Sequence, residues 1–279
     1  MKEGSEVRPP AAAGTFYPAD PIELRETVLS MLETKDSPKD EDPAGVIAPH
    51  AGYMYSGPTA GAAYASLRTR HYETVVIVAP SHREAFRGIT IFGGRAYSTP
   101  LGEVVVNAQR REQLVHELPI ARISSAGHRA EHALEVQLPF LQVVMEGFTL
   151  LPIVMGEQSR DTVISLGSAL GRAFGGERVL LIASTDLSHY YPADIAEKID
   201  RVSIEDIRAF NPEGLMEHLE ENIAEACGGG PTVAVMTALR ILGADRVEIA
   251  HHCTSGDVTG DRRSVVGYCS AIAWKKRAA

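Results

Sequence analysis

Three histidines each follow a short apolar run of the chain. Residues 45–49, 74–81 and 179–188 lead to His50, His82 and His189, respectively. Each run is rich in Val, Ile and Leu without alternation, which is typical of a parallel strand buried on both faces. Functional residues of open α/β sheets collect beyond the carboxyl ends of the strands. Because histidine is the commonest metal ligand and transfers protons near neutral pH, the pattern predicts a metal or acid–base site at this edge.

Cys227 is the best candidate for a third ligand, since two histidines leave a metal site incomplete. It precedes three glycines and Pro231, which suits the first position of a helix. A cysteine beside a helix N-terminus has a lowered pKa, and the resulting thiolate binds metals. Without a metal, Cys227 would be a nucleophile with His189 as its base, or a small buried apolar residue. Asp186 would orient His189, bind a substrate hydroxyl or cap a helix.

A competing motif is His128-Arg-Ala-Glu-His132, which matches the H-x-x-E-H pattern of inverzincin metalloproteases. Glu135 extends the same helical face by one turn. Five-residue patterns also arise by chance, and Gly127 indicates that a helix begins only at His128 or later. The favoured interpretation therefore places His132 and Glu135 on the wall of a substrate pocket and His128 at the surface.

Composition narrows the class of protein. The 279 residues are 44% hydrophobic and carry a formal net charge of -9, which argues against a nucleic-acid surface. The three scattered cysteines do not form a disulfide framework and fit a reducing cytoplasm. No apolar stretch approaches the length of a membrane span, and the N-terminus lacks the apolar core of a signal peptide. We therefore expect a cytoplasmic protein with no membrane or nucleic-acid partner.

The elements that must position these residues alternate along the chain. A helix is expected after Asp20-Pro21, and a polar connector is expected over residues 35–43. Further helices are predicted at 58–67, 131–145, 159–174, 195–209, 212–221 and 231–242, and strands at 46–48, 75–79, 88–96, 101–107, 150–155, 179–183, 247–252 and 264–274. A loop rich in Gly and Asp covers 254–263. This alternation indicates an α/β fold with antiparallel strands added at the end.

Several of these motifs together resemble the MEMO family. They occur in order from the Ala13-Gly-Thr-Phe-Tyr17 segment to the last strand, and include Ile47 to Tyr53, Tyr55-Ser-Gly57, Ala79 to His82, Thr99-Pro-Leu101, Glu131 to Pro139, Ser184 to His189 and Cys227 to Pro231. The resemblance implies a single MEMO-like domain over residues 1–279. It also implies a three-layer αβα sandwich with a mixed sheet, as in class III extradiol dioxygenases.

The resemblance also implies roles for the candidate residues. His50 and His82 would be metal ligands, and Cys227 would stand where those dioxygenases have a glutamate. A thiolate is softer than a carboxylate and favours copper(I), zinc or a differently tuned iron. The implied metal is thus Fe(2+) or Cu, with Zn as a further option. His189 would be the acid/base residue.

Three classes of function follow. The first is a metal-dependent redox enzyme, dioxygenase-like, acting on a small aromatic or phenolic substrate. The second is a non-catalytic protein that keeps the pocket and binds a peptide or a partner, and the third is a zinc or cysteine hydrolase. The expected catalytic residues are His189 and Asp186, and the expected substrate-binding residues are His132, Glu135, Tyr53, Phe16 and Tyr17. The resemblance suggests an AMMECR1-like protein and a radical SAM protein as pathway partners, and a homo-oligomer is also compatible with the sequence.

Overall fold

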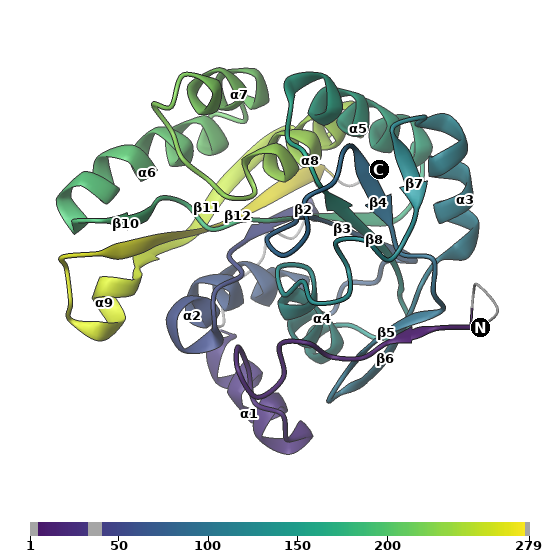
Figure 1. Cartoon of the computed structure of the whole chain (residues 1–279), viewed down its shortest axis with the longest axis horizontal. Helices are drawn as coiled ribbons and strands as arrows, with labels where there is room; N and C mark the ends of the chain where they lie inside the picture. Colours follow the sequence, from purple (N-terminus) through teal and green to yellow (C-terminus); the bar gives the residue numbers. More distant parts are fainter. Residues whose placement is uncertain (1–4, 33–40, 277–279) are drawn as a thin grey trace.

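A mixed β-sheet of nine strands forms the centre of the computed structural model, which describes residues 5–32 and 41–276 (Figure 1). The order across the sheet is β10 (His189–Tyr191), β12 (Val265–Lys276), β2 (Glu41–Ala48), β9 (Val179–Ser184), β3 (Thr74–Pro80), β8 (Thr149–Met155), β4 (Ile89–Ile91) and β7 (Ala121–Ile123), and β11 (Arg246–Thr254) pairs with β12. The four central strands β2, β9, β3 and β8 are parallel. β12 and β4 flank them in antiparallel orientation. The expected mixed sheet is confirmed.

Helices cover both faces of this sheet (Figure 1). One face packs against α1 (Pro21–Met31), α2 (Tyr53–Tyr64) and α4 (Leu138–Val144), and a small sheet of β1 (Val7–Arg8), β5 (Ala96–Thr99) and β6 (Gly102–Val105) adjoins them. The other face packs against α3 (Ala108–Glu117), α5 (Arg160–Ala173), α6 (Ala193–Arg208), α7 (Pro212–Glu220) and α8 (Gly229–Ile241). Three short helices complete the chain: η1 (Ala65–Leu67), η2 (Glu135–Gln137) and α9 (Ser255–Thr259). The prediction that residues 1–279 form a single domain stays a prediction.

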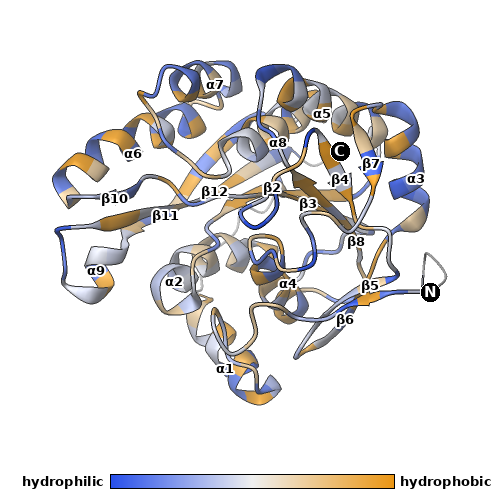
Figure 2. Cartoon of the chain, viewed as in Figure 1, coloured by the Kyte–Doolittle hydropathy of each residue, from blue (hydrophilic) through white to orange (hydrophobic). Residues whose placement is uncertain are grey.

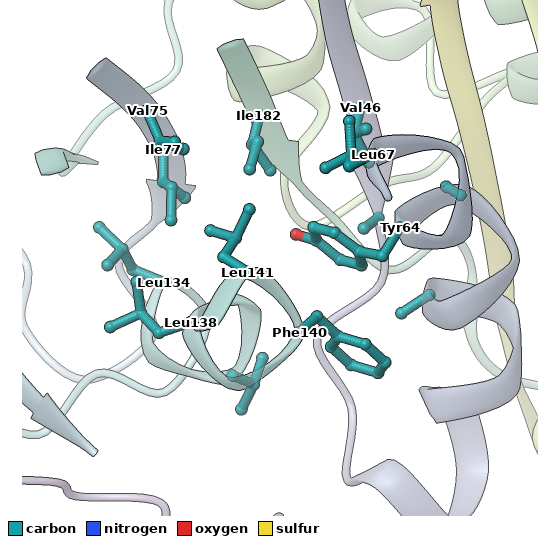
Figure 3. Packing of buried hydrophobic residues seen from close by; sticks show 14 of the residues in the cluster. Val46, Tyr64, Leu67, Val75, Ile77, Leu134, Leu138, Phe140, Leu141 and Ile182 are labelled. Atoms are coloured by element: carbon teal, nitrogen blue, oxygen red, sulfur yellow. The ribbon is translucent and has the colours of Figure 1, made fainter. Parts of the chain in front are cut away.

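The core explains why the central runs are strands. All seven residues of β3 are buried, as expected for a parallel strand covered on both faces. On one face, Val75 and Ile77 of β3 point toward α4, where Phe140 stacks on Tyr64 with ring centroids 5.0 Å apart (Figure 3). Hydrophilic residues collect on the outer turns of α3 and α7, and hydrophobic residues collect on the central strands (Figure 2). Among the described residues, no helix has the length and apolar character that crossing a membrane requires.

Several predicted elements need correction. The expected helix 131–145 begins only at η2, and ahead of it the Glu131 carboxylate accepts the backbone N–H groups of His132 and Ala133. The expected strand 88–96 is divided between β4 and β5, which belong to different sheets. The loop 254–263 contains α9, which begins with a capping box at Thr254. Residues 41–43 of the expected connector belong to β2, and residues 35–40 lie outside the described part of the chain.

Candidate metal centre

His50 lies two residues beyond the carboxyl end of β2 and is only 2% exposed. Its backbone N–H donates to Asp186 Oδ1 at 2.7 Å, which joins this strand end to the segment after β9. The ring nitrogen Nδ1 lies 2.9 Å from Ser184 Oγ, and Nε2 lies 3.1 Å from Cys227 Sγ. Burial, with a further contribution from the charge of His82, lowers the pKa of His50 to about 3. The imidazole is therefore neutral near pH 7, which is the form that binds metals.

His82, beyond the carboxyl end of β3, is held by Glu131. Its Nδ1 lies 3.0 Å from Oε1 of this carboxylate, and its backbone N–H donates to Oε2 at 2.5 Å. Burial alone would raise the pKa of Glu131. The hydrogen bonds from His82 and from the backbone of Ala133 outweigh burial and lower this pKa to about 2. An ionised carboxylate only accepts, so Nδ1 of His82 carries a proton and donates it to Glu131, which leaves Nε2 directed away from this carboxylate.

His132 completes a cluster of three imidazoles. Its ring centroid lies 5.5 Å from that of His50 and 5.0 Å from that of His82, and one ring nitrogen of each histidine lies within 4.8 Å of the other two. His132 Nδ1 lies 3.2 Å from Glu131 Oε1, but it is buried without a hydrogen bond to any described residue. Burial lowers the pKa of His132 to about 4. Three clustered imidazoles with an unsatisfied buried nitrogen among them are a donor set that fits a divalent transition metal.

Cys227 adjoins this cluster on the side of His50. Its Sγ accepts the backbone N–H of Asp186 at 3.3 Å. The next residue, Gly228, packs so tightly on β9 that a Cβ there would lie 2.1 Å from the Ser184 carbonyl oxygen. Burial raises the pKa of the Cys227 thiol, which is the reverse of the shift expected beside a helix N-terminus. Without a metal the thiol is neutral and lies within hydrogen-bond distance of His50 Nε2, whereas a bound cation removes the proton from a coordinating thiol.

His189 and Asp186 lie at the margin of the cluster. The His189 side chain is 27% exposed, and its Nδ1 lies 4.0 Å from Glu225 Oε1. The charge of His189 contributes to the lowered pKa of His50, so the two imidazoles are close enough to interact electrostatically. Asp186 is buried, and burial raises its pKa. Its carboxylate binds the backbone of His50, which makes it a link between two strand ends.

The residues predicted to bind substrate occupy two different environments. Phe16 lies against the cluster, with its ring centroid 4.3 Å from that of His132. Tyr53 is buried and its hydroxyl donates to the Val136 carbonyl at 2.6 Å. Glu135 is fully buried and accepts from the Tyr17 hydroxyl; it also accepts from the Arg8 guanidinium and from the backbone of Ala11 and Ala12. The hydrogen bonds of Glu135 therefore attach the N-terminal segment to η2.

His128, which was predicted to lie at the surface, is fully buried. Its Nδ1 lies 2.6 Å from the Tyr97 hydroxyl, and its carbonyl accepts from Arg8 Nε at 2.7 Å. Residues 128–133 are not helical, because Gly127 turns the chain with φ of +73° and Glu131 binds the following N–H groups. The two histidines of the H-x-x-E-H motif consequently have different surroundings. His132 joins His50 and His82, and His128 does not.

Comparison with known proteins identifies the family of this chain. The family model described as Memo-like protein matches residues 8–272. This chain belongs to the MEMO1 family. A MEMO1 family protein of Methanothermobacter thermautotrophicus is 40% identical over 94% of this chain and 98% of its own length. A second, from Methanocaldococcus jannaschii, is 36% identical over 96% of this chain and 99% of its own length. Among solved structures, an uncharacterized protein of Escherichia coli K12 has a similar fold, with a TM-score of 0.50 and 13% identity over 82% of this chain and 99% of its own.

The sequence of this MEMO1 family member did not reveal every residue at the site. Glu131 belongs to the H-x-x-E-H pattern, but that pattern does not predict that it binds His82 and the backbone of His132. Ser184, which contacts His50, lies at the end of an apolar run and gives no signal of its own. Its only distinction in the sequence is that it is a polar residue at the carboxyl end of a run of apolar residues.

Proposed function

We propose that this protein is a metal-dependent redox enzyme that holds a transition metal with His50, His82 and Cys227, and with His132 beside them. The observation that carries the proposal is the cluster of three imidazoles whose ligand atoms lie within 4.8 Å of one another. Cys227 Sγ, 3.1 Å from His50 Nε2, extends the donor set with a sulfur atom. Imidazole and thiolate ligands suit iron, copper and zinc rather than magnesium or calcium. Iron or copper fits a redox role.

The residues around the cluster suit a small aromatic substrate. When bound, iron or copper would supply Lewis acidity and one-electron chemistry. Phe16 offers an apolar ring face beside His132, against which an aromatic substrate would stack. His189, partly exposed at the margin, would exchange a proton with a phenolic hydroxyl and with solvent. Asp186 would hold the His50 segment in place through its backbone. This division of labour resembles that of class III extradiol dioxygenases, with sulfur in place of a carboxylate ligand.

Metal analysis tests this proposal most directly. Protein purified without oxygen should contain iron or copper in stoichiometric amount, and it should consume oxygen when small catechols are added. Cys227→Ser and His132→Ala, each analysed for metal content, would show which of the two completes the coordination. Stoichiometric zinc without oxygen consumption would instead support a hydrolase. Absence of any metal would reject the proposal.

A peptide- or partner-binding role is the second candidate, and Tyr190 favours it. This residue follows His189 and is 76% exposed. The centroids of the Tyr190 and His189 rings lie 5.7 Å apart. Its φ of +68° is strained for an aromatic residue, and such strain concentrates at functional sites. Exposed tyrosine side chains are common anchors of protein interfaces. This role would be favoured if the metal-free protein bound a peptide as tightly as the metal-loaded protein and if the Tyr190→Ala variant did not bind it.

A further inference from the structure

A buried chain of hydrogen bonds runs from Tyr64 to His50 through Gln137 and Ser184. The Tyr64 hydroxyl donates to Gln137 Oε1 at 2.7 Å, and Gln137 Nε2 donates to Ser184 Oγ at 2.9 Å. Ser184 Oγ lies 2.9 Å from His50 Nδ1. Gln137 and Ser184 are fully buried, so no water competes for these bonds. The chain comes from four separate elements and ends on a candidate metal ligand.

Two backbone carbonyls fix the direction of every bond in this chain. The Pro49 carbonyl, 3.0 Å from Gln137 Nε2, can only accept, so the amide nitrogen must face Pro49 and Ser184. The Ala133 carbonyl, 2.6 Å from Ser184 Oγ, can also only accept, and it takes the single hydroxyl proton of the serine. Ser184 Oγ is left with lone pairs alone for its other neighbours. His50 Nδ1 must therefore carry a proton and donate it to Ser184.

We propose that Ser184, supported by Gln137, is a positioning residue that fixes His50 as the Nδ1–H tautomer before any metal arrives. The lone pair of Nε2 then faces Cys227 and the proposed metal position. Metal-binding histidines generally donate their other N–H to such a partner, which orients the ring. His82 is oriented by the Glu131 carboxylate, whereas His50 is oriented by a neutral hydroxyl. The tautomer assignment needs no metal; its importance for coordination rests on the proposed function.

Nitrogen NMR of the metal-free protein tests the assignment directly. Two-bond ¹H–¹⁵N spectra at pH 7.5 distinguish Nδ1–H from Nε2–H imidazoles, and comparison with His50→Gln identifies the His50 signals. Wild-type protein should show His50 as Nδ1–H. Ser184→Ala should lose this signature, because Nδ1 no longer has an acceptor, and Ser184→Thr, which keeps the hydroxyl, should restore it. Ser203→Ala is the matched control, since this serine is equally buried on α6 and its hydroxyl has no hydrogen-bond partner among the described residues.

Cobalt(II) titration of the same proteins measures the consequence. Ser184→Ala should bind Co(2+) about 10- to 100-fold more weakly than wild type, the usual effect of removing a partner of a metal ligand. Ser203→Ala should bind as wild type does. A wild-type spectrum with His50 as Nε2–H overturns the proposal, and this measurement does not depend on any variant folding. An Nδ1–H signature in a protein that binds no cobalt would retain the tautomer assignment and reject the metal centre.

Discussion

Glu131 binds His82 with both carboxylate oxygens: Oε1 lies 3.0 Å from the ring Nδ1, and Oε2 accepts the backbone N–H at 2.5 Å. Side chain and backbone are thereby fixed by one residue, although the chain separates them by 49 positions. The anionic carboxylate also increases the electron density of the ring, which would make His82 Nε2 a stronger metal ligand. The two strand-end histidines thus have unequal supports, an anion for His82 and a neutral hydroxyl for His50.

Replacing this carboxylate by an amide should weaken metal binding. Glu131→Gln keeps the size of the side chain but removes the negative charge and one acceptor oxygen. We expect about 10- to 100-fold weaker binding of Co(2+), measured by calorimetric titration. Glu103→Gln, which alters an exposed ion pair with Arg95, should bind normally. Equal affinities of both variants would mean that Glu131 does not support a ligand.

Removing a ligand should have a larger effect than removing its support. His82→Ala should lower the metal content of the purified protein sharply, because His82 supplies one of the three clustered imidazoles. His71→Ala removes an exposed histidine and should leave the metal content unchanged. Elemental analysis of the two variants gives the answer. Wild-type metal loading in His82→Ala would reject the site.

His128 should matter for stability and not for metal binding. His128→Ala removes a fully buried side chain and its contact with Tyr97, which should cost roughly 3 kcal/mol of unfolding free energy. Its metal content should equal that of wild type, since His128 lies outside the cluster. Denaturant unfolding and elemental analysis measure the two effects. Loss of metal in a variant that still folds would revive the zinc protease motif.

His128 should also make stability depend on pH. Burial lowers its pKa to about 3 in the folded protein, whereas an unfolded histidine titrates near about 6.5. Between these values the unfolded chain binds more protons, so acid favours unfolding by up to about 1.4 kcal/mol per pH unit for this group. The unfolding free energy of metal-free protein should therefore fall as the pH decreases from 6.5 toward 4.

The variant His128→Asn isolates that contribution. It should lose less stability per pH unit than wild type in urea unfolding at pH 6.5, 5.5 and 4.5. Part of the slope should remain, because His50 is also buried with a pKa of about 3. His116→Asn, on the exposed side of α3, should follow the wild-type curve. Identical slopes for all three proteins would mean that His128 is already protonated in the folded state.

His189 should be needed for turnover and not for metal loading. His189→Ala should keep its metal, because this imidazole is not part of the three-histidine cluster. Its oxygen consumption with catechols should fall by roughly 100-fold or more, the usual scale for a general acid or base. Metal stoichiometry and oxygen uptake, measured on one preparation, separate the two roles. If the variant is metal-free, His189 is a ligand.

The positions of His50 and His82 were predictable because they depend on local pattern. A buried parallel strand delivers whatever follows it to one edge of the sheet, so the apolar runs were sufficient. The location of Cys227 next to the start of α8 was predicted in a similar way, from Gly228, Gly229 and Gly230. These features are encoded within a few residues of each functional side chain.

The remaining features depend on contacts between distant segments. His132 was assigned to a helix, but it lies ahead of η2 and meets His50 and His82, which follow other strands. The pKa of Cys227 was expected to fall beside the helix N-terminus, but burial by neighbouring segments raises it. Gln137 could not be distinguished from an ordinary polar residue, because the three hydrogen bonds of its side chain involve partners from other parts of the chain.

The position of β12 bears on when the protein can acquire an ion. This last strand pairs with β2, the strand that leads to His50, through Ala271 opposite Ile47. During synthesis β2 therefore lacks this neighbour until residues 265–276 have left the ribosome, and Cys227 emerges well after His50 and His82. A nascent chain presents His50 and His82 without the remaining donors. An ion at the proposed site would therefore find its full set of donors only after residues 265–276 have been made and have paired with β2.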